Sequence, residues 1–177
     1  MVYLFLENGF EETEAIATLD FALRGGVDVK TVSKEKYVTG NHNITVKADL
    51  SFDEISFEGL EGVILPGGLP GTTNLENNQD VIKYLEYCHK NSLMIAAICA
   101  APSVPGKLGF LKGRKATCYP SFEEYLTGAD AVSDKAVSDG NIITGKAMGA
   151  AIPFGYKIVE YLKGKEKADQ VLDSIYG

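Results

Sequence analysis

Short apolar runs alternate with longer amphipathic segments along this chain. The runs at residues 2–6, 62–65, 93–98 and 142–144 have the length and composition of strands, and residues 27–32 alternate apolar and polar positions as a strand does. The segments at 11–24, 79–88, 150–162 and 165–175 space their apolar positions as helices do. Strands that alternate with helices favour a mostly parallel sheet covered on both faces. The pattern therefore predicts a flavodoxin-like three-layer α/β/α sandwich, a fold of the α/β class.

Weaker patterns fill the remaining segments. We expect a hairpin at 38–46, a strand at 114–119, a short helix at 122–126, and a small hairpin that pairs residues 131–132 with 136–137. Residues 49–57 are predicted to be irregular or to form a short helix. Because no linker, repeat or low-complexity segment divides the chain, we expect a single domain over residues 1–177.

The charge balance narrows the classes of partner. The 177 residues include 17 Lys and Arg against 24 Asp and Glu, which gives a net charge of −7. This excess argues against a nucleic-acid binder and against docking on an anionic membrane. The lysine-rich stretch 157–167 also holds Glu160 and Glu166, and we interpret it as a solvated helical face. The longest apolar stretch, 93–101, is too short to span a bilayer.

Cysteine and histidine usage points to free thiols. Cys88, Cys99 and Cys118 are odd in number and follow no disulfide or CxxC spacing. Because the only histidines are His42 and His89, and no Cys/His cluster occurs, we expect neither a metal nor a cofactor. The expected setting is a reducing cytoplasm, in which thiols persist.

The strongest local signal for chemistry is the run MIAAICAAP at residues 94–102. Its small residues would let the backbone fold tightly around Cys99, where an apolar strand gives way to a helix. Backbone N–H groups and the dipole at that helix start would stabilise a thiolate. A lone cysteine in an apolar run is more often a buried core thiol, but the surrounding pattern favours a nucleophile elbow.

The acidic motif GFEETE at residues 9–14 follows the first predicted strand. Glu14 lies one turn into the next helix, so its side chain leans back toward the strand ends. There its carboxyl group would accept a proton from Cys99 or hydrogen-bond its oxidised sulfur, and burial would raise its pKa. The alternative is that these acids only complement the helix dipole.

A glycine pair follows the strand at 62–65. Gly67 and Gly68 allow backbone conformations closed to other residues and let the chain approach a ligand. The N–H of Gly68, together with that of Ala100, would form an oxyanion hole beside Cys99. The alternative is an ordinary turn, because a Pro-Gly-Gly sequence alone is a weak signal.

The order of these motifs resembles the DJ-1/ThiJ/PfpI family, and within it the DJ-1-like branch. The matching segments span nearly the whole chain: GFEETE at 9–14, RGGV at 24–27, VILPGG at 63–68, AAICAAP at 96–102 and IVEYLKGK at 158–165. The resemblance implies that Cys99 oxidises readily to a sulfinate. It also implies that a protonated Glu14 hydrogen-bonds the sulfur, and that Gly68 and Ala100 supply backbone donors.

The resemblance further implies a homodimer joined through the first helix and nearby loops. Activities attributed to the branch are a glutathione-independent glyoxalase or deglycase acting on small carbonyls such as methylglyoxal, a redox-regulated chaperone, and a sensor of oxidative stress. An enzyme would use Cys99 as nucleophile and Glu14 as acid and base. A redox sensor would use the same two residues without turnover, so the sequence leaves both functions open.

The chain departs from the family's pattern in the segment ATCYP at 116–120. Tyr119 stands where the best-studied branch members have a histidine before proline. A phenol cannot replace imidazole as a base at neutral pH. No histidine follows Cys99, although class I glutamine amidotransferases and the protease-like branch need one there. A cysteine hydrolase or amidotransferase is therefore a distant third hypothesis.

Four further residues are candidates for the pocket around the cysteine. Gly67 and Tyr119 follow from the motifs above, and Cys118 precedes Tyr119. His42 is the one histidine with a route to the site, from the hairpin at 38–46, although a solvated turn is the favoured interpretation. A disulfide between Cys118 and Cys99 stays open, because its geometry cannot be read from sequence.

Overall fold

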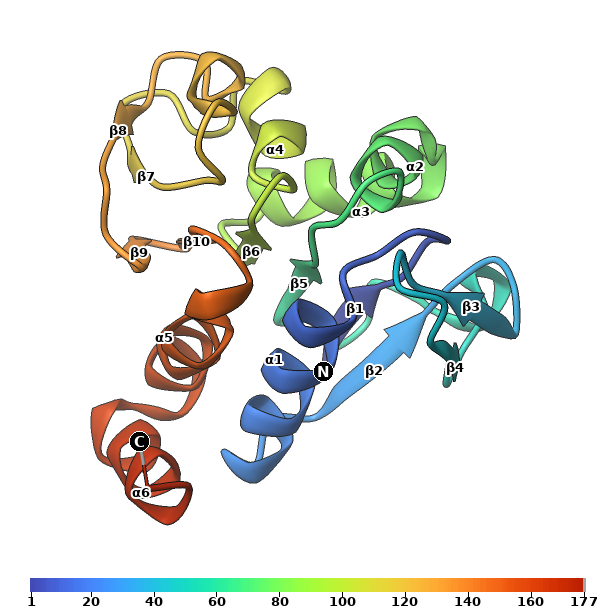
Figure 1. The fold of residues 1–177 in the computed structure, drawn as a ribbon, viewed down its shortest axis with the longest axis horizontal. Helices are drawn as coiled ribbons and strands as arrows, with labels where there is room; N and C mark the ends of the chain where they lie inside the picture. The colour runs from blue at the N-terminus through green and yellow to red at the C-terminus, as the bar shows by residue number, and fades with distance from the viewer. Residues whose placement is uncertain (177) are drawn as a thin grey trace.

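The computed structural model describes residues 1–176, and its centre is a six-stranded sheet with the order β2-β1-β5-β6-β10-β9 (Figure 1). The strands are β1 (Val2–Phe5), β2 (Val29–Val32), β5 (Gly62–Leu65), β6 (Met94–Ile98), β9 (Ala136–Asp139) and β10 (Ile142–Gly145). The first five strands in this order are parallel, and β9 is antiparallel to β10. The carboxyl ends of the parallel strands therefore meet along one edge of the sheet.

Helices cover both faces of this sheet, which confirms the predicted three-layer sandwich (Figure 1). One face carries α1 (Glu12–Arg24), α5 (Ala151–Lys163) and α6 (Lys165–Ser174), and the other carries α2 (Gly71–Asn77), α3 (Gln79–Lys90) and α4 (Ser103–Lys107). Successive β6 residues alternate between two apolar clusters, with Ile98 on the α1 and α5 side and Ala97 on the α3 side. Because both faces are buried, the strand is apolar throughout.

Two small sheets lie outside the main one. The predicted hairpin at 38–46 is present as β3 (Tyr37–Thr39) and β4 (Thr45–Lys47). The predicted pairing of 131–132 with 136–137 is wrong, because β8 (Asp130–Ala131) pairs in parallel with β7 (Lys115–Ala116). Strand β9 instead turns back onto β10 through Gly140, whose φ of +60° suits a tight hairpin turn.

Other segments are shorter or more helical than expected. The strand predicted at 114–119 is reduced to β7, because the backbone after Ala116 no longer pairs with a neighbouring strand. The N–H of Thr117 donates to Thr144 Oγ1, and the N–H of Tyr119 donates to the carbonyl of Cys99. Helix α2 has no apolar repeat in the sequence and is an element that the pattern missed. Short 3₁₀ turns at Phe52–Glu54 and Glu123–Tyr125 match the short helices expected there.

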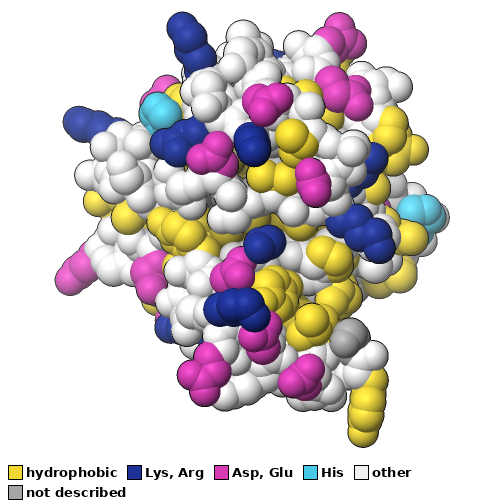
Figure 2. Space-filling view, turned by 90° about the vertical axis from the view of Figure 1, so that its left-hand side faces the viewer, with side chains coloured by type: hydrophobic (Ala, Val, Ile, Leu, Met, Phe, Trp, Pro, Cys, Tyr) yellow, Lys and Arg dark blue, Asp and Glu magenta, His cyan; other side chains and the backbone are white. Residues whose placement is uncertain are grey.

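The face that carries α5, α6 and β9 shows cationic and anionic side chains interspersed (Figure 2). Lys157 pairs with Glu160 at 2.7 Å, and Lys165 pairs with Asp169 at 2.6 Å. This lysine-rich stretch is therefore the solvated face that its sequence predicted. Within residues 1–176 no helix is long and apolar enough to cross a membrane.

Candidate active site

Cys99 lies in a strained turn at the carboxyl end of β6. Its φ is +66°, a left-handed conformation that is rare for a residue with a side chain. Hydrogen bonds on both sides fix this turn, since the Cys99 N–H donates to the Gly145 carbonyl at 2.9 Å and the Cys99 carbonyl accepts the Tyr119 N–H at 2.7 Å. The predicted elbow is thus present, and such strained positions concentrate at functional sites.

Glu14 reaches the cysteine from the first turn of α1. Its side chain is 1% exposed, and its Oε2 accepts the N–H of Gly67 at 2.9 Å. Burial raises the pKa of Glu14 to about 7, although hydrogen bonds from Cys99 and Gly67 act in the opposite direction. Within residues 1–176, the second oxygen, Oε1, is buried without a nitrogen or oxygen partner. The carboxyl group is therefore placed to hold or release a proton near neutral pH.

The pKa of the Cys99 thiol is raised, contrary to the expected stabilised thiolate. Burial is the main cause, and the neighbouring Glu14 charge adds to it. The N–H groups of Ala100 and Gly68 act in the opposite direction as hydrogen-bond donors to the sulfur. Because two negative charges in this space would repel each other strongly, the Cys99–Glu14 pair keeps at least one proton at neutral pH.

Glycines give the site its close packing. A Cβ at Gly67 would lie 2.6 Å from both the Cβ of Cys99 and Oε2 of Glu14. Gly68 has a φ of +90°, and a Cβ there would collide with the backbone N of Glu11. Both positions therefore require glycine, and the Gly68 N–H lies within hydrogen-bonding reach of the Cys99 sulfur.

Glu11 is a part of this site that the sequence did not single out. It is the N-cap of α1, and its Oε2 accepts the backbone N–H of Glu14 at 2.6 Å. Its charge raises the pKa of Glu14. Stabilisation of the helix start, the alternative given for the acidic motif, therefore accounts for Glu11. It does not account for Glu14, whose buried carboxyl group hydrogen-bonds with Cys99.

A shallow pocket of about 300 Å³ lies over Cys99. Its lining is formed by Cys99, Ala100, Gly68, Glu11, Asn41, Leu69, Tyr119 and Phe122. Tyr119 is thus placed at the pocket as expected. Leu69 and Phe122 were missed, because isolated apolar residues outside regular helices and strands carry no periodic signal.

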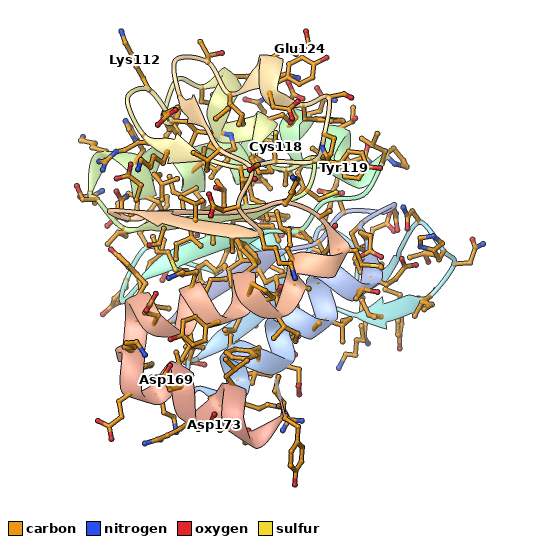
Figure 3. All side chains as sticks on the ribbon, turned by 60° about the vertical axis from the view of Figure 1, so that its left-hand side comes forward. Lys112, Cys118, Tyr119, Glu124, Asp169 and Asp173 are labelled. Atoms are coloured by element: carbon orange, nitrogen blue, oxygen red, sulfur yellow. The ribbon has the colours of Figure 1, made fainter. Side chains whose placement is uncertain are left out.

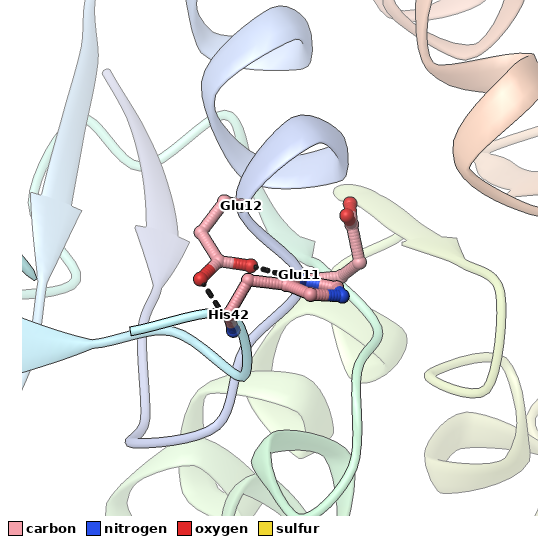
Figure 4. A group of neighbouring side chains, drawn as sticks. All are labelled: Glu11, Glu12 and His42. Atoms are coloured by element: carbon pink, nitrogen blue, oxygen red, sulfur yellow. Dashed lines mark hydrogen bonds and ion pairs between the residues drawn. The ribbon is translucent and has the colours of Figure 1, made fainter. Parts of the chain in front are cut away.

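His42 lies outside the lining of this pocket, although Asn41 belongs to it. The ring Nδ1 of His42 is 3.0 Å from Oε2 of Glu12, and the backbone N–H of His42 donates to Oε1 of the same carboxylate at 2.7 Å (Figure 4). Glu11, Glu12 and His42 each place one potential metal-ligand atom within 4.8 Å of those of the other two. The buried Glu12 carboxylate therefore anchors the β3–β4 loop to α1. Desolvation by burial would raise its pKa, but hydrogen bonds from the Glu12 and His42 backbones and from the His42 ring outweigh it, so the pKa of Glu12 is lowered.

Cys118 also lies outside the pocket lining. It is 3% exposed and precedes the half-exposed Tyr119 on the segment after β7 (Figure 3). Burial raises its pKa to about 11. Cys88, Cys99 and Cys118 are all free thiols in this structure.

Known proteins resemble this chain in both fold and sequence. The family model of the DJ-1/PfpI family matches residues 1–161. Protein DJ-1 homolog B of Arabidopsis thaliana is 38% identical over 174 residues, which cover 96% of this chain but only 40% of that protein. The chain therefore spans less than half the length of that relative.

Two further relatives match over nearly their full length. The deglycase PfpI of Pyrococcus furiosus is 31% identical over 168 residues, which cover 92% of this chain and 100% of that protein. The crystal structure of Drosophila melanogaster DJ-1beta superposes with a TM-score of 0.93 at 34% identity, covering 99% of this chain and 96% of that one.

Proposed function

The chain belongs to the DJ-1/PfpI family, and we propose that it uses Cys99 and Glu14 to convert reactive dicarbonyls without glutathione, as a glyoxalase or deglycase. The observation that carries this proposal is the buried Glu14 carboxyl group beside the elbow thiol, with the pocket open above them. A deglycase among the relatives supports the same substrate class. DJ-1 homologues support the assignment to the DJ-1-like branch.

The first step forms a bond between the Cys99 sulfur and the aldehyde carbon of methylglyoxal. The proton of the Cys99–Glu14 pair ends on the former aldehyde oxygen, which gives a hemithioacetal. The N–H groups of Gly68 and Ala100 stabilise the negative charge that develops on this oxygen. Both N–H groups already lie within hydrogen-bonding reach of the Cys99 sulfur, next to which this oxygen forms.

Glu14 then carries the proton between the two carbons. As a carboxylate it removes the C1–H, the hydroxyl proton passes from the C1 oxygen to the C2 oxygen, and Glu14 returns its proton to C2. C1 is thereby oxidised to a thioester while the C2 ketone becomes an alcohol. Water then hydrolyses the thioester, which releases lactate and regenerates the Cys99 thiol. The electrons balance within the substrate, and no external reductant is needed.

The test is methylglyoxal consumption without glutathione by wild type, Cys99→Ala and Glu14→Gln. We expect both changes to abolish turnover, with d- or l-lactate appearing only in wild type. Cys88→Ala is the matched control, because Cys88 is a buried thiol on α3 away from the pocket. Full turnover by Glu14→Gln would refute the proton-carrying role.

A second candidate function is a redox sensor or stress chaperone that works by oxidation of Cys99. It is favoured by the amides of Gly68 and Ala100 at the sulfur, which would also hold sulfinate oxygens, and by Tyr119 in the place of a histidine base. Mild peroxide should then add oxygen selectively at Cys99. Intact mass and peptide mapping that find equal oxidation at Cys118 would count against it.

We further propose a homodimer formed through α1 in a reducing cytoplasm. Ile16 and Leu23 on this helix are 41% and 51% exposed, which suits a contact between two copies. Light scattering of wild type and Ile16→Lys tests the dimer, since the charged variant should be monomeric. The free thiols support the reducing setting.

A further inference from the structure

The rim of the Cys99 pocket is more apolar than the chemistry at its base requires. Leu69 is 53% exposed and Tyr119 is 47% exposed, and both line the pocket together with Phe122. The rings of Tyr119 and Phe122 meet edge to face with centroids 6.4 Å apart. Exposed apolar side chains gathered beside a nucleophile form a surface on which an apolar ligand group can rest.

The charge of the pocket points to the same kind of ligand. Of the described residues, Glu11 is the one with a charged side chain in the lining, and neither Lys, Arg nor His contributes. Glu14 lies beside Cys99 and shares a hydrogen bond with it. A substrate carboxylate would therefore meet negative groups with no cation to pair with, and desolvation would add to the repulsion.

We infer that this site selects neutral 2-oxoaldehydes with an apolar alkyl or aryl substituent and rejects anionic ones. The inference rests on the proposed function and names its substrate class. With the aldehyde carbon at the Cys99 sulfur, the substituent lies against Leu69 and Tyr119. Tyr119 is thereby a specificity-determining residue, in contact with the substrate but outside the proton transfer.

The size of the effect follows from the shape of the pocket. A substituent in a well-formed apolar pocket changes kcat/KM by about tenfold or more per added group. This pocket is open on one side, so we expect kcat/KM for phenylglyoxal to exceed that for methylglyoxal by about tenfold. We expect 4-carboxyphenylglyoxal, which keeps the ring and adds a charge, to fall at least about tenfold below phenylglyoxal.

The experiment measures kcat/KM for methylglyoxal, phenylglyoxal, cyclohexylglyoxal and 4-carboxyphenylglyoxal. Cyclohexylglyoxal separates apolar size from the electronic effect of an aryl ketone. The variants are Tyr119→Ala, Tyr119→Phe, which keeps the ring, and Tyr161→Ala, which removes a comparably exposed tyrosine from α5. We expect the preference for the larger substrates to collapse in Tyr119→Ala and to persist in Tyr119→Phe and Tyr161→Ala.

The possible results separate this inference from the proposed function. Equal kcat/KM values for all four substrates in wild type, or an unchanged preference in Tyr119→Ala, overturn the inference while the dicarbonyl activity stands. Consumption of none of them by wild type overturns both. Thermal unfolding checks that each variant is folded, and a preference that a folded Tyr161→Ala also loses overturns the role of Tyr119.

Discussion

The Oε2 oxygen of Glu11 accepts the backbone N–H of Glu14 across 2.6 Å, and both side chains are almost fully buried. One contact thus joins two roles. As the N-cap, Glu11 sets where α1 begins and hence where Glu14 lies relative to Cys99. As a charge, it raises the pKa of Glu14. The cap and the proton carrier are therefore coupled, and substitution can separate them.

Glu11→Gln should keep the cap and remove the charge. Because the negative charge of Glu11 disfavours a carboxylate at Glu14, its loss lowers the pKa of Glu14. The proposed mechanism needs Glu14 as a carboxylate, so the rise of kcat/KM with pH should move to lower pH. Glu12→Gln makes the same charge change on a carboxylate that faces His42, and its midpoint should not move. A shift to higher pH in Glu11→Gln would contradict the coupling.

The raised pKa of Glu14 should make stability fall as pH rises. The folded state holds this proton up to a pKa of about 7, whereas the unfolded chain releases it near 4.5. Folding therefore binds a proton between these values, and the stabilisation present below pH 4.5 is lost as pH passes 7. The loss amounts to about 3 kcal/mol. Glu14→Gln removes the titration, so its free energy of unfolding relative to wild type should rise from pH 4.5 to 7 in urea titrations. A pH-independent difference would show that Glu14 titrates alike in both states.

Gly67→Ala should disable the site. The added Cβ would lie 2.6 Å from Cys99 Cβ and from Glu14 Oε2, so one of the two must move. We expect dicarbonyl turnover to fall at least about tenfold, since displacements of this size disrupt catalytic geometry. Gly149→Ala is the control, because a Cβ there meets nothing within 4 Å. Wild-type turnover by Gly67→Ala would mean that the Cys99–Glu14 contact is dispensable.

Glu12 and His42 should differ sharply in their effect on stability. Glu12 is buried and accepts the backbone N–H of His42 at 2.7 Å, whereas the His42 side chain is 70% exposed. Glu12→Ala leaves the loop amide without its acceptor, and we expect the free energy of unfolding to drop by about 1–3 kcal/mol. His42→Ala should change it by less than about 0.5 kcal/mol and leave turnover unchanged. Faster hydrogen exchange at the His42 amide in Glu12→Ala would locate the effect in the β3–β4 loop. Loss of turnover in His42→Ala would show instead that His42 takes part in the reaction.

Much of the fold could be predicted because its signals are local and redundant. The strand at 62–65 has the predicted bounds, since a strand buried on both faces is apolar at every position and ends at the following Pro-Gly-Gly. Cys99 at the end of β6 follows from the same logic. In a parallel sheet, this also predicts that the segments bearing Glu14, Gly67 and Cys99, which follow three of the strands, meet at one edge.

Pairings and environments were decided only by the tertiary structure. The sequence did not decide the partner of residues 136–139: they pair with β10 through a short turn at Gly140, while residues 130–131 pair with β7. Helix α2 is held by a few buried side chains and has no apolar repeat. The raised pKa of Cys99 and the place of His42 depend on burial and on neighbours distant in the chain. A sequence records which groups can ionise or donate, but the desolvation and contacts that set their chemistry arise only when separate segments pack together.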